Sequence, residues 1–207
     1  MKHQHTSQLA LLLIGALSAA AGQAAEANFI GPAVGVRLAA LHNEVDYGGF
    51  LAGSSSSKND TGFDVFAAYG LPLSGDWIAN VGVNYTLNKT DFGTVTYIDG
   101  GAQTVSARLK SHWSVFVAPG YRFAPQWQAY AKFSYHNARG EYTDSQLGRS
   151  SVNTNGFGYG AGVGYAVTRN IEASFEVRQI DFSRESANLS NGEPNVTEAA
   201  LQLAYRF

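Results

Sequence analysis

Ser134 and His136 are the residues whose types and spacing come nearest to a catalytic pair. They are two positions apart, so on a β-strand both side chains lie on the same face. A serine beside a histidine base is the arrangement of a nucleophilic hydrolase, and Glu141 is the nearby acid that could complete it. However, Phe133 and Tyr135 form the alternate, apolar face of this stretch. We therefore interpret Ser134 and His136 as a polar pair that points into the interior of the fold.

Other chemistry finds little support in the sequence. The chain has no cysteine, which excludes disulfides, thiolate metal ligands and a cysteine nucleophile. No spacing of His, Asp and Glu predicts a metal site, and His112 and His42 are interpreted as an interior and a rim residue. The run from Gly156 to Gly164 repeats G-x-G inside a strand, whereas a dinucleotide site needs G-x-G-x-x-G at a strand-to-helix turn. The sequence thus predicts no catalytic residue, cofactor site or metal site.

The composition indicates one all-β domain. Among 207 residues only 14% are charged, while 13% are aromatic and 23 are glycine. This profile is typical of a barrel or a sandwich and unlike that of a soluble enzyme. The formal net charge is −2, which gives no reason to expect a nucleic-acid partner.

The N-terminus predicts a secretory signal peptide over residues 1–24. Lys2 begins it, and an apolar run from Leu9 to about Ala21 follows. That run is about a dozen residues, shorter than the roughly 20 that a spanning helix needs. Small residues allow cleavage after Ala24 or after Ala27. We therefore expect the mature domain to occupy residues 25–207.

Eight stretches of this domain alternate between an apolar and a mixed face, the period of a β-strand. They cover residues 30–42, 63–71, 77–87, 109–123, 127–136, 156–167, 171–178 and 195–207. Their connections alternate strictly in length. Polar segments 43–60, 88–106, 137–155 and 181–194 predict long loops, the first of them mobile, and residues 72–76, 124–126 and 168–170 predict tight turns. Long extracellular loops and short periplasmic turns are typical of membrane barrels, with both termini on the periplasmic side.

The face opposite the apolar one decides between a membrane barrel and a soluble, lipocalin-like one. It carries a column of alternate glycines, which a solvent-facing strand has no reason to keep, because glycine weakens strands. The narrow lumen of an eight-stranded barrel is filled by side chains, and glycines leave room for large neighbours such as Tyr130, Lys132 and Glu176. The same face carries charges of both signs, which predict a paired network inside the lumen: Arg37, Asp64, Lys110, Arg122, Lys132, Glu172, Glu176, Arg178, Glu198 and Arg206. Aromatic residues near the strand ends predict a girdle at the membrane interface: Trp77, Trp127, Tyr69, Tyr121, Phe123, Tyr205 and Phe207.

The last strand, Asn195 to Phe207, carries a family resemblance. Its alternating apolar face and its Tyr205-Arg206-Phe207 ending resemble the closing strand of small eight-stranded outer-membrane barrels, namely the OmpX/Ail/Lom group, opacity-type proteins and the OmpA transmembrane domain. The resemblance implies an eight-stranded antiparallel up-and-down transmembrane β-barrel in the outer membrane of a Gram-negative cell. It also implies recognition of Phe207 by the barrel assembly machinery, contact with outer-membrane lipid and lipopolysaccharide, and a monomer. Because the chain ends at the barrel, we expect no periplasmic domain.

For function, the sequence predicts a non-enzymatic barrel that supports envelope integrity or surface interaction, including adhesion to host or surface ligands. The long loops carry aromatic residues suited to such contacts, namely Tyr47, Phe50, Phe92 and Tyr97. One alternative is a lipid A-modifying enzyme of the deacylase or acyltransferase type, which would need a Ser/His/acid set facing lipid. A second alternative is a small pore, which would need an open lumen along the glycine column.

Overall fold

The computed structural model describes residues 28–49, 53–98, 101–146, 148–183, 185–187 and 190–207. The expected signal peptide and both expected cleavage points lie outside these residues. The strands are β1 (Gly31–Gly49), β2 (Ser55–Pro72), β3 (Trp77–Thr86), β4 (Thr90–Ile98), β5 (Ala102–Ala124), β6 (Trp127–Asp144), β7 (Gly148–Ala166), β8 (Ile171–Phe182), β9 (Glu185–Ala187) and β10 (Ser190–Arg206). No helix in this described part of the chain has the length and apolar character to cross a membrane.

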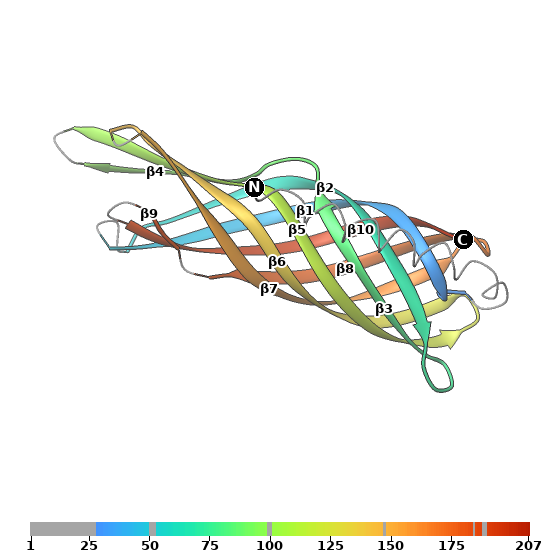
Figure 1. Cartoon of the computed structure of the whole chain (residues 1–207). Coiled ribbons are helices and arrows are strands. Elements are labelled where there is room, and N and C mark those ends of the chain that lie inside the picture. The colour runs from blue at the N-terminus through green and yellow to red at the C-terminus, as the bar shows by residue number, and fades with distance from the viewer. Residues whose placement is uncertain (1–27, 50–52, 99–100, 147, 184, 188–189) are drawn as a thin grey trace, which may run out of the picture.

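Eight of these strands close into a barrel (Figure 1). Their order is β1-β2-β3-β5-β6-β7-β8-β10, each pair is antiparallel, and β10 pairs with β1 to complete the ring. Val36, for example, lies opposite Leu203 across the closing seam. The short strands β4 and β9 pair with β5 and β10 and lie outside this ring. The predicted all-β, up-and-down fold is confirmed.

The two ends of the barrel differ, as the connection lengths predict. The tight turns and the C-terminus lie at one end, and β4 and β9 lie at the other (Figure 1). At the turn end, Leu73 N–H donates to the Trp77 carbonyl at 2.9 Å, and Phe207 N–H donates to the Pro32 carbonyl at 3.0 Å. By the rule for outer-membrane barrels the turn end is periplasmic and the opposite end is extracellular. We call the extracellular part of the barrel, beyond the apolar belt, the rim.

An apolar belt surrounds the middle of the barrel. Leu38, Leu201 and Phe175 lie side by side on adjacent strands, and their exposed fractions are 53%, 64% and 46%. So large a continuous apolar surface is what a barrel presents to lipid. Aromatic pairs border the belt on the periplasmic side, where Trp77 packs against Tyr121 and Trp127 against Tyr165 with tilted rings whose centroids are 5.3 and 4.7 Å apart.

The four segments that the sequence predicts as long loops are mostly strand, so their assignment as loops is wrong. β1 continues to Gly49 and β2 begins at Ser55, so most of segment 43–60 is a hairpin. Segments 137–155 and 181–194 likewise continue β6, β7, β8 and β10, and segment 88–106 holds β4 and the start of β5. These extensions enclose an apolar core of their own, which includes Leu41, Val45, Phe92, Val105 and Val196. Burial of this core stabilises the strands where exposed loops would have left the same side chains in water.

A bulge in β5 reverses which residues face inward, and it corrects the interpretation of two of them. Ser111 has a φ of 51°, and the pairing register shifts between Lys110 and Trp113. Below the bulge the even-numbered residues face inward, whereas above it the odd-numbered ones do. Leu109, predicted on the lipid-facing side, is therefore buried at 4% exposure in the rim core, and Lys110 leaves the lumen to pair with Glu141. Successive side chains of a strand point to opposite faces, so one inserted residue reverses which of the following side chains point inward.

Candidate functional site

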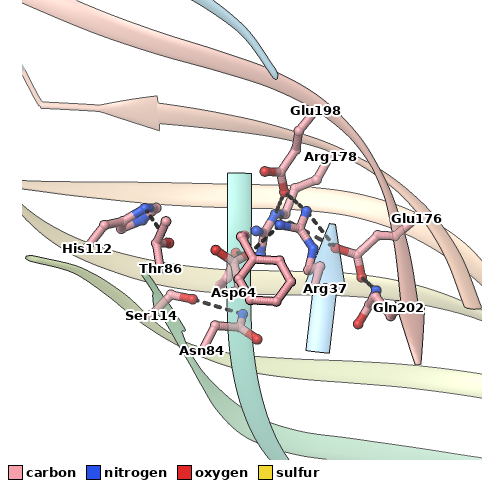
Figure 2. Close-up of polar contacts among 12 residues, drawn as sticks. Arg37, Asp64, Asn84, Thr86, His112, Ser114, Glu176, Arg178, Glu198 and Gln202 are labelled. Atoms are coloured by element: carbon pink, nitrogen blue, oxygen red, sulfur yellow. Dashed lines mark hydrogen bonds and ion pairs between the residues drawn. The ribbon is translucent and has the colours of Figure 1, made fainter. Parts of the chain in front are cut away.

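The centre of the lumen holds a buried network of charges (Figure 2). Arg37 donates to Asp64 at 2.6 Å and to Glu198, and Arg178 Nε donates to Glu198 Oε1 at 2.5 Å. Lys132 completes the network through Glu176 at 2.9 Å. Each of these side chains is at most 6% exposed.

Three cations thus meet three carboxylates in this network. Pairing offsets much of the cost of removing each charge from water. The predicted lumen network is present at Arg37, Asp64, Lys132, Glu176, Arg178 and Glu198. Arg206 pairs with Glu172 nearer the periplasmic mouth, and Arg122 pairs with the exposed Asp76 there.

Glycines make the room for these large side chains. A Cβ on Gly162 would lie 2.5 Å from the Tyr130 ring, and one on Gly158 would lie 2.5 Å from Ser134 Oγ. Gly35 and Gly82, which the sequence analysis did not single out, receive the rings of Phe66 and Phe116 in the same way. The predicted role of the glycine column is therefore confirmed for Tyr130 and extends to aromatic rings on β2 and β5.

Ser134 and His136 lie inside the lumen, as the alternation predicts, and a second histidine joins them. Ser134 Oγ lies 2.8 Å from His136 Nε2, and His136 Nδ1 lies 2.8 Å from His112 Nε2. Thr86 Oγ1 contacts the far nitrogen of His112 at 3.3 Å (Figure 2). His136 is fully buried and Ser134 is 5% exposed, so neither reaches the lipid-facing surface.

Glu141 does not join this cluster. Its carboxylate accepts a hydrogen bond from Lys110 and lies 3.6 Å from Arg149, on the rim. The arrangement is therefore a chain of hydroxyl and imidazole groups in the lumen, and Glu141, the acid predicted as a candidate third member, is not part of it. Among the described residues, no group of three or more His, Asp or Glu side chains is placed to hold a metal ion.

The rim carries ion pairs that hold its strands together. Burial acts to raise the pKa of Asp91, but hydrogen bonds from Lys58 and from the backbone N–H of Gly93, at 2.8 and 2.9 Å, outweigh it and leave that pKa below its usual value. The hydrogen bond from Lys110 likewise lowers the pKa of Glu141. Both carboxylates are therefore ionised at neutral pH, and each joins two strands.

The aromatic residues expected to be exposed for recognition are largely buried, so this expectation is wrong for them. Tyr47 is 6% exposed and Phe92 is 1% exposed, and both belong to the rim core. Tyr97 packs against the same core and donates from its hydroxyl to Asp144 at 2.9 Å. Phe50 lies outside the described residues. Sequence reasoning missed their burial because the rim is apolar inside and polar outside, the reverse of the membrane belt.

Three solved structures are among those that are similar to this chain. OmpT, the outer-membrane protease of Escherichia coli, is 12% identical, with 85% of this chain and 96% of that one covered and a TM-score of 0.55. Ail of Yersinia pestis, solved with the heparin analogue sucrose octasulfate, is 14% identical and has a TM-score of 0.42. That comparison covers 83% of this chain and 98% of Ail. Neisserial surface protein A is 18% identical over 84% and 99% at a TM-score of 0.43.

No curated protein matches the sequence. The family model described as "Outer membrane protein beta-barrel domain" matches residues 9–207, nearly the whole chain. With the closed antiparallel barrel and its apolar belt, this match shows that the chain belongs to the outer-membrane protein β-barrel family and is located in the outer membrane.

Proposed function

We propose that this barrel is a non-enzymatic protein that supports the envelope and makes surface contacts through its rim. The observation that carries the proposal is the rim's own apolar core, because it turns the extracellular segments into a shaped surface. The β4–β5 pair and its neighbours project beyond the rest of the barrel (Figure 1). A surface of this kind can bind a partner without first ordering a loop, which lowers the entropic cost of binding.

The charges of the rim suggest which surface could be recognised. The described ends of β2 and β4–β7 carry six cations and four carboxylates: Lys58, Lys89, Arg108, Lys110, Arg139 and Arg149 against Asp60, Asp91, Glu141 and Asp144. The opposite side, on β1, β8 and β10, carries Glu44, Asp46, Asp181 and Glu193. The positive side favours contact with an anionic polysaccharide or protein surface, since complementary potentials steer association.

Charge reversal on the positive side tests this part of the proposal. Cells that carry the protein should adhere to surfaces coated with dextran sulfate, and the double variant Arg139→Glu/Arg149→Glu should lose most of that adhesion. The matched control is Glu44→Gln/Asp46→Asn on the acidic side, which should adhere at least as well as the unchanged protein. Equal adhesion of the charge-reversed cells would contradict recognition through these charges.

The enzymatic alternative rests on one specific observation, the Ser134–His136–His112 chain. Because its groups are enclosed in the lumen, we expect lipid A to have the same acyl chains in cells with and without the protein. Mass spectrometry of lipid A decides this. Loss or gain of an acyl chain that depends on Ser134 would make the protein an enzyme.

The pore alternative requires a continuous path through the lumen. The charged network and the rim core above it are both buried, which favours a closed barrel. We therefore expect the purified protein to show no channel conductance in planar bilayers. Stable conductance steps would contradict the proposal of a closed lumen.

A shallow groove on the lipid-facing surface supports contact with an outer-leaflet lipid. Its floor is a row formed by Val177 and three alanines on adjacent strands, Ala161, Ala199 and Ala40. A polar row lies on its rim side: His42, Asn59, Thr197 and Gln179. The groove has a volume of about 880 Å³. We propose that an acyl chain of a lipopolysaccharide or phospholipid molecule occupies it, with the polar row at the level of the headgroup. We also propose that the protein is a monomer and that the barrel assembly machinery recognises Phe207.

A further inference from the structure

A cavity occupies the periplasmic half of the lumen, below the charged network. Its volume is about 60 Å³, which is room for roughly four to six water molecules. Its walls combine aromatic rings with hydrogen-bonding groups: Phe29, Phe66, Phe116, Tyr130, Gln128 and Gln202. We call it the chamber.

Among the described residues, one group in the chamber wall has no hydrogen-bond partner. Gln128 is 6% exposed, and its Oε1 atom is fully enclosed without a hydrogen bond. A buried amide oxygen without a donor is costly, so such groups are normally satisfied by water or by a ligand. Gln128 lines the chamber, so a small molecule there that donates a hydrogen bond would satisfy this oxygen after a turn of the amide.

The inner end of the chamber is closed by charges that already have partners. Lys132 donates to Glu176 at 2.9 Å, and its ammonium lies 4.3 Å from the centroid of the Phe116 ring. Gln202 donates to the same carboxylate at 3.2 Å. Since these charges are balanced, the chamber favours a neutral polar molecule over an ion.

Phe29 closes the periplasmic end. It is 1% exposed and packs against Ile78, near the start of β3, and Ala166, at the end of β7. Both residues adjoin periplasmic turns. Two glycines receive it: a Cβ on Gly70 would lie 1.9 Å from the Phe29 carbonyl oxygen, and one on Gly164 would lie 3.3 Å from its ring. The chain here precedes β1, so no ladder of strand hydrogen bonds holds it.

The attachment of Phe29 is weak for so buried a residue. Its backbone N–H donates to Glu172 Oε1 at 3.2 Å, and the same oxygen also accepts from Arg206 at 2.5 Å. Its φ of 71° lies in the left-handed region, which strains a non-glycine residue. Release of Phe29 from this position would relieve the backbone strain.

We propose that the chamber binds water and small neutral polar molecules, and that Phe29 is a removable stopper which controls their exchange with the periplasm. The charged network above stays closed, so the device is a vestibule and not a through-pore. This inference does not depend on what the rim binds.

Cysteine labelling tests the stopper cleanly, because the chain has no native cysteine. Ala118 lines the chamber at 3% exposure, and Ala118→Cys should react slowly with methyl methanethiosulfonate, a small neutral reagent, in the intact barrel. Adding Phe29→Ala should speed that reaction by about tenfold or more, since buried thiols react through local opening. Gly70→Ala should also speed the reaction. It leaves the Phe29 side chain unsubstituted, but its new Cβ displaces the Phe29 backbone.

Two control sites separate the stopper from general loosening. Ala107→Cys, 4% exposed in the rim core, should stay slow in all backgrounds, and Asp76→Cys on a periplasmic turn should stay fast. A bulky anionic methanethiosulfonate should remain slow at Ala118→Cys even with Phe29→Ala, because the chamber is small and excludes charge. Rapid labelling of Ala118→Cys with Phe29 intact, equal rates with and without Phe29, or parallel acceleration at Ala107→Cys would overturn the proposal.

Discussion

At the scale of single residues, the protein is defined by side chains that are charged and yet fully buried. Arg37 lies at the centre, within hydrogen-bond distance of Asp64 and Glu198 and 3.8 Å from Glu176. An intact buried ion pair contributes little net stability, because the cost of removing both charges from water offsets their attraction. Removing one partner is nevertheless strongly destabilising. Loss of one partner leaves an uncompensated charge buried in the lumen.

We predict that Arg37→Ala lowers the free energy of unfolding by about 3–5 kcal/mol, because it leaves Asp64 and Glu198 with too few cations. Urea titration of the barrel in lipid vesicles, followed by tryptophan fluorescence, measures this. The matched control is Arg139→Ala on the exposed rim, where the change should stay within about 0.5 kcal/mol. Equal unfolding midpoints for the two variants would show that the buried network is not an essential support.

At the scale of elements, the bulge in β5 joins two parts of one strand that obey opposite rules. Below Ser111 the strand presents apolar residues to lipid, and to the lumen it presents small or polar residues together with Phe116. Above it, Val105, Ala107 and Leu109 face inward to the rim core. The positive φ of Ser111 is what lets one strand serve both.

We predict that Ser111→Gly stabilises the barrel by up to about 1 kcal/mol, because glycine adopts a positive φ without the steric cost that serine incurs. Ser111→Val should destabilise it, since a β-branched residue tolerates this conformation poorly. Ser106→Gly, on the same strand without a positive φ, is the control and should destabilise by about 0.5–1 kcal/mol. The free energies of unfolding are compared in the same vesicle assay, and destabilisation by Ser111→Gly would argue against the bulge.

The rim strands should also respond to pH through Glu141. Its hydrogen bond with Lys110 lowers its pKa below the usual value of 4.5. A depressed folded-state pKa contributes stability above the unfolded pKa, and this contribution is lost as the pH falls through the lower, folded value. Carboxyl ¹³C titration by NMR should therefore give Glu141 a pKa below 4.5, and Lys110→Ala should raise it towards that value. An unchanged pKa in Lys110→Ala would mean that the pair does not form in solution.

At the scale of the whole molecule, the barrel is two environments joined end to end. The membrane part is apolar outside and charged inside, whereas the rim is apolar inside and polar outside. Phe207 lies at the opposite end and is 58% exposed, stacking edge-on against Tyr205 at 5.1 Å. So exposed a ring contributes little to the folded barrel, which fits a role before folding is complete.

We predict that Phe207→Ala lowers the amount of folded protein in the outer membrane of cells several-fold, because the recognition signal that we propose for the assembly machinery would be lost. The same variant, refolded from urea into vesicles, should lose no more than about 1 kcal/mol of stability, since over half of its side chain is exposed. Phe123→Ala, at 56% exposure, is the matched control and should assemble normally in cells. Equal assembly of both variants would contradict the signal.

The sequence by itself determined the barrel, its strand order, its apolar belt and the pairing of charges in the lumen. It could do so because in a membrane barrel the lipid imposes one rule, strict alternation with the apolar face outward, and that rule is visible at every second residue. The inward placement of Ser134 and His136 follows from the same rule.

Only the tertiary structure decided the rest. The sequence predicts loops where the rim strands lie. In the rim the apolar residues face inward and the polar residues face outward, the reverse of the membrane belt, and the polarity pattern alone does not distinguish such strands from polar loops. Leu109 was assigned to the wrong face because the bulge at Ser111 depends on backbone geometry that the residue type does not reveal. His112 beside His136, and Phe29 over the chamber, depend on how segments far apart in the sequence meet across the closed barrel, which alternation within one strand cannot predict.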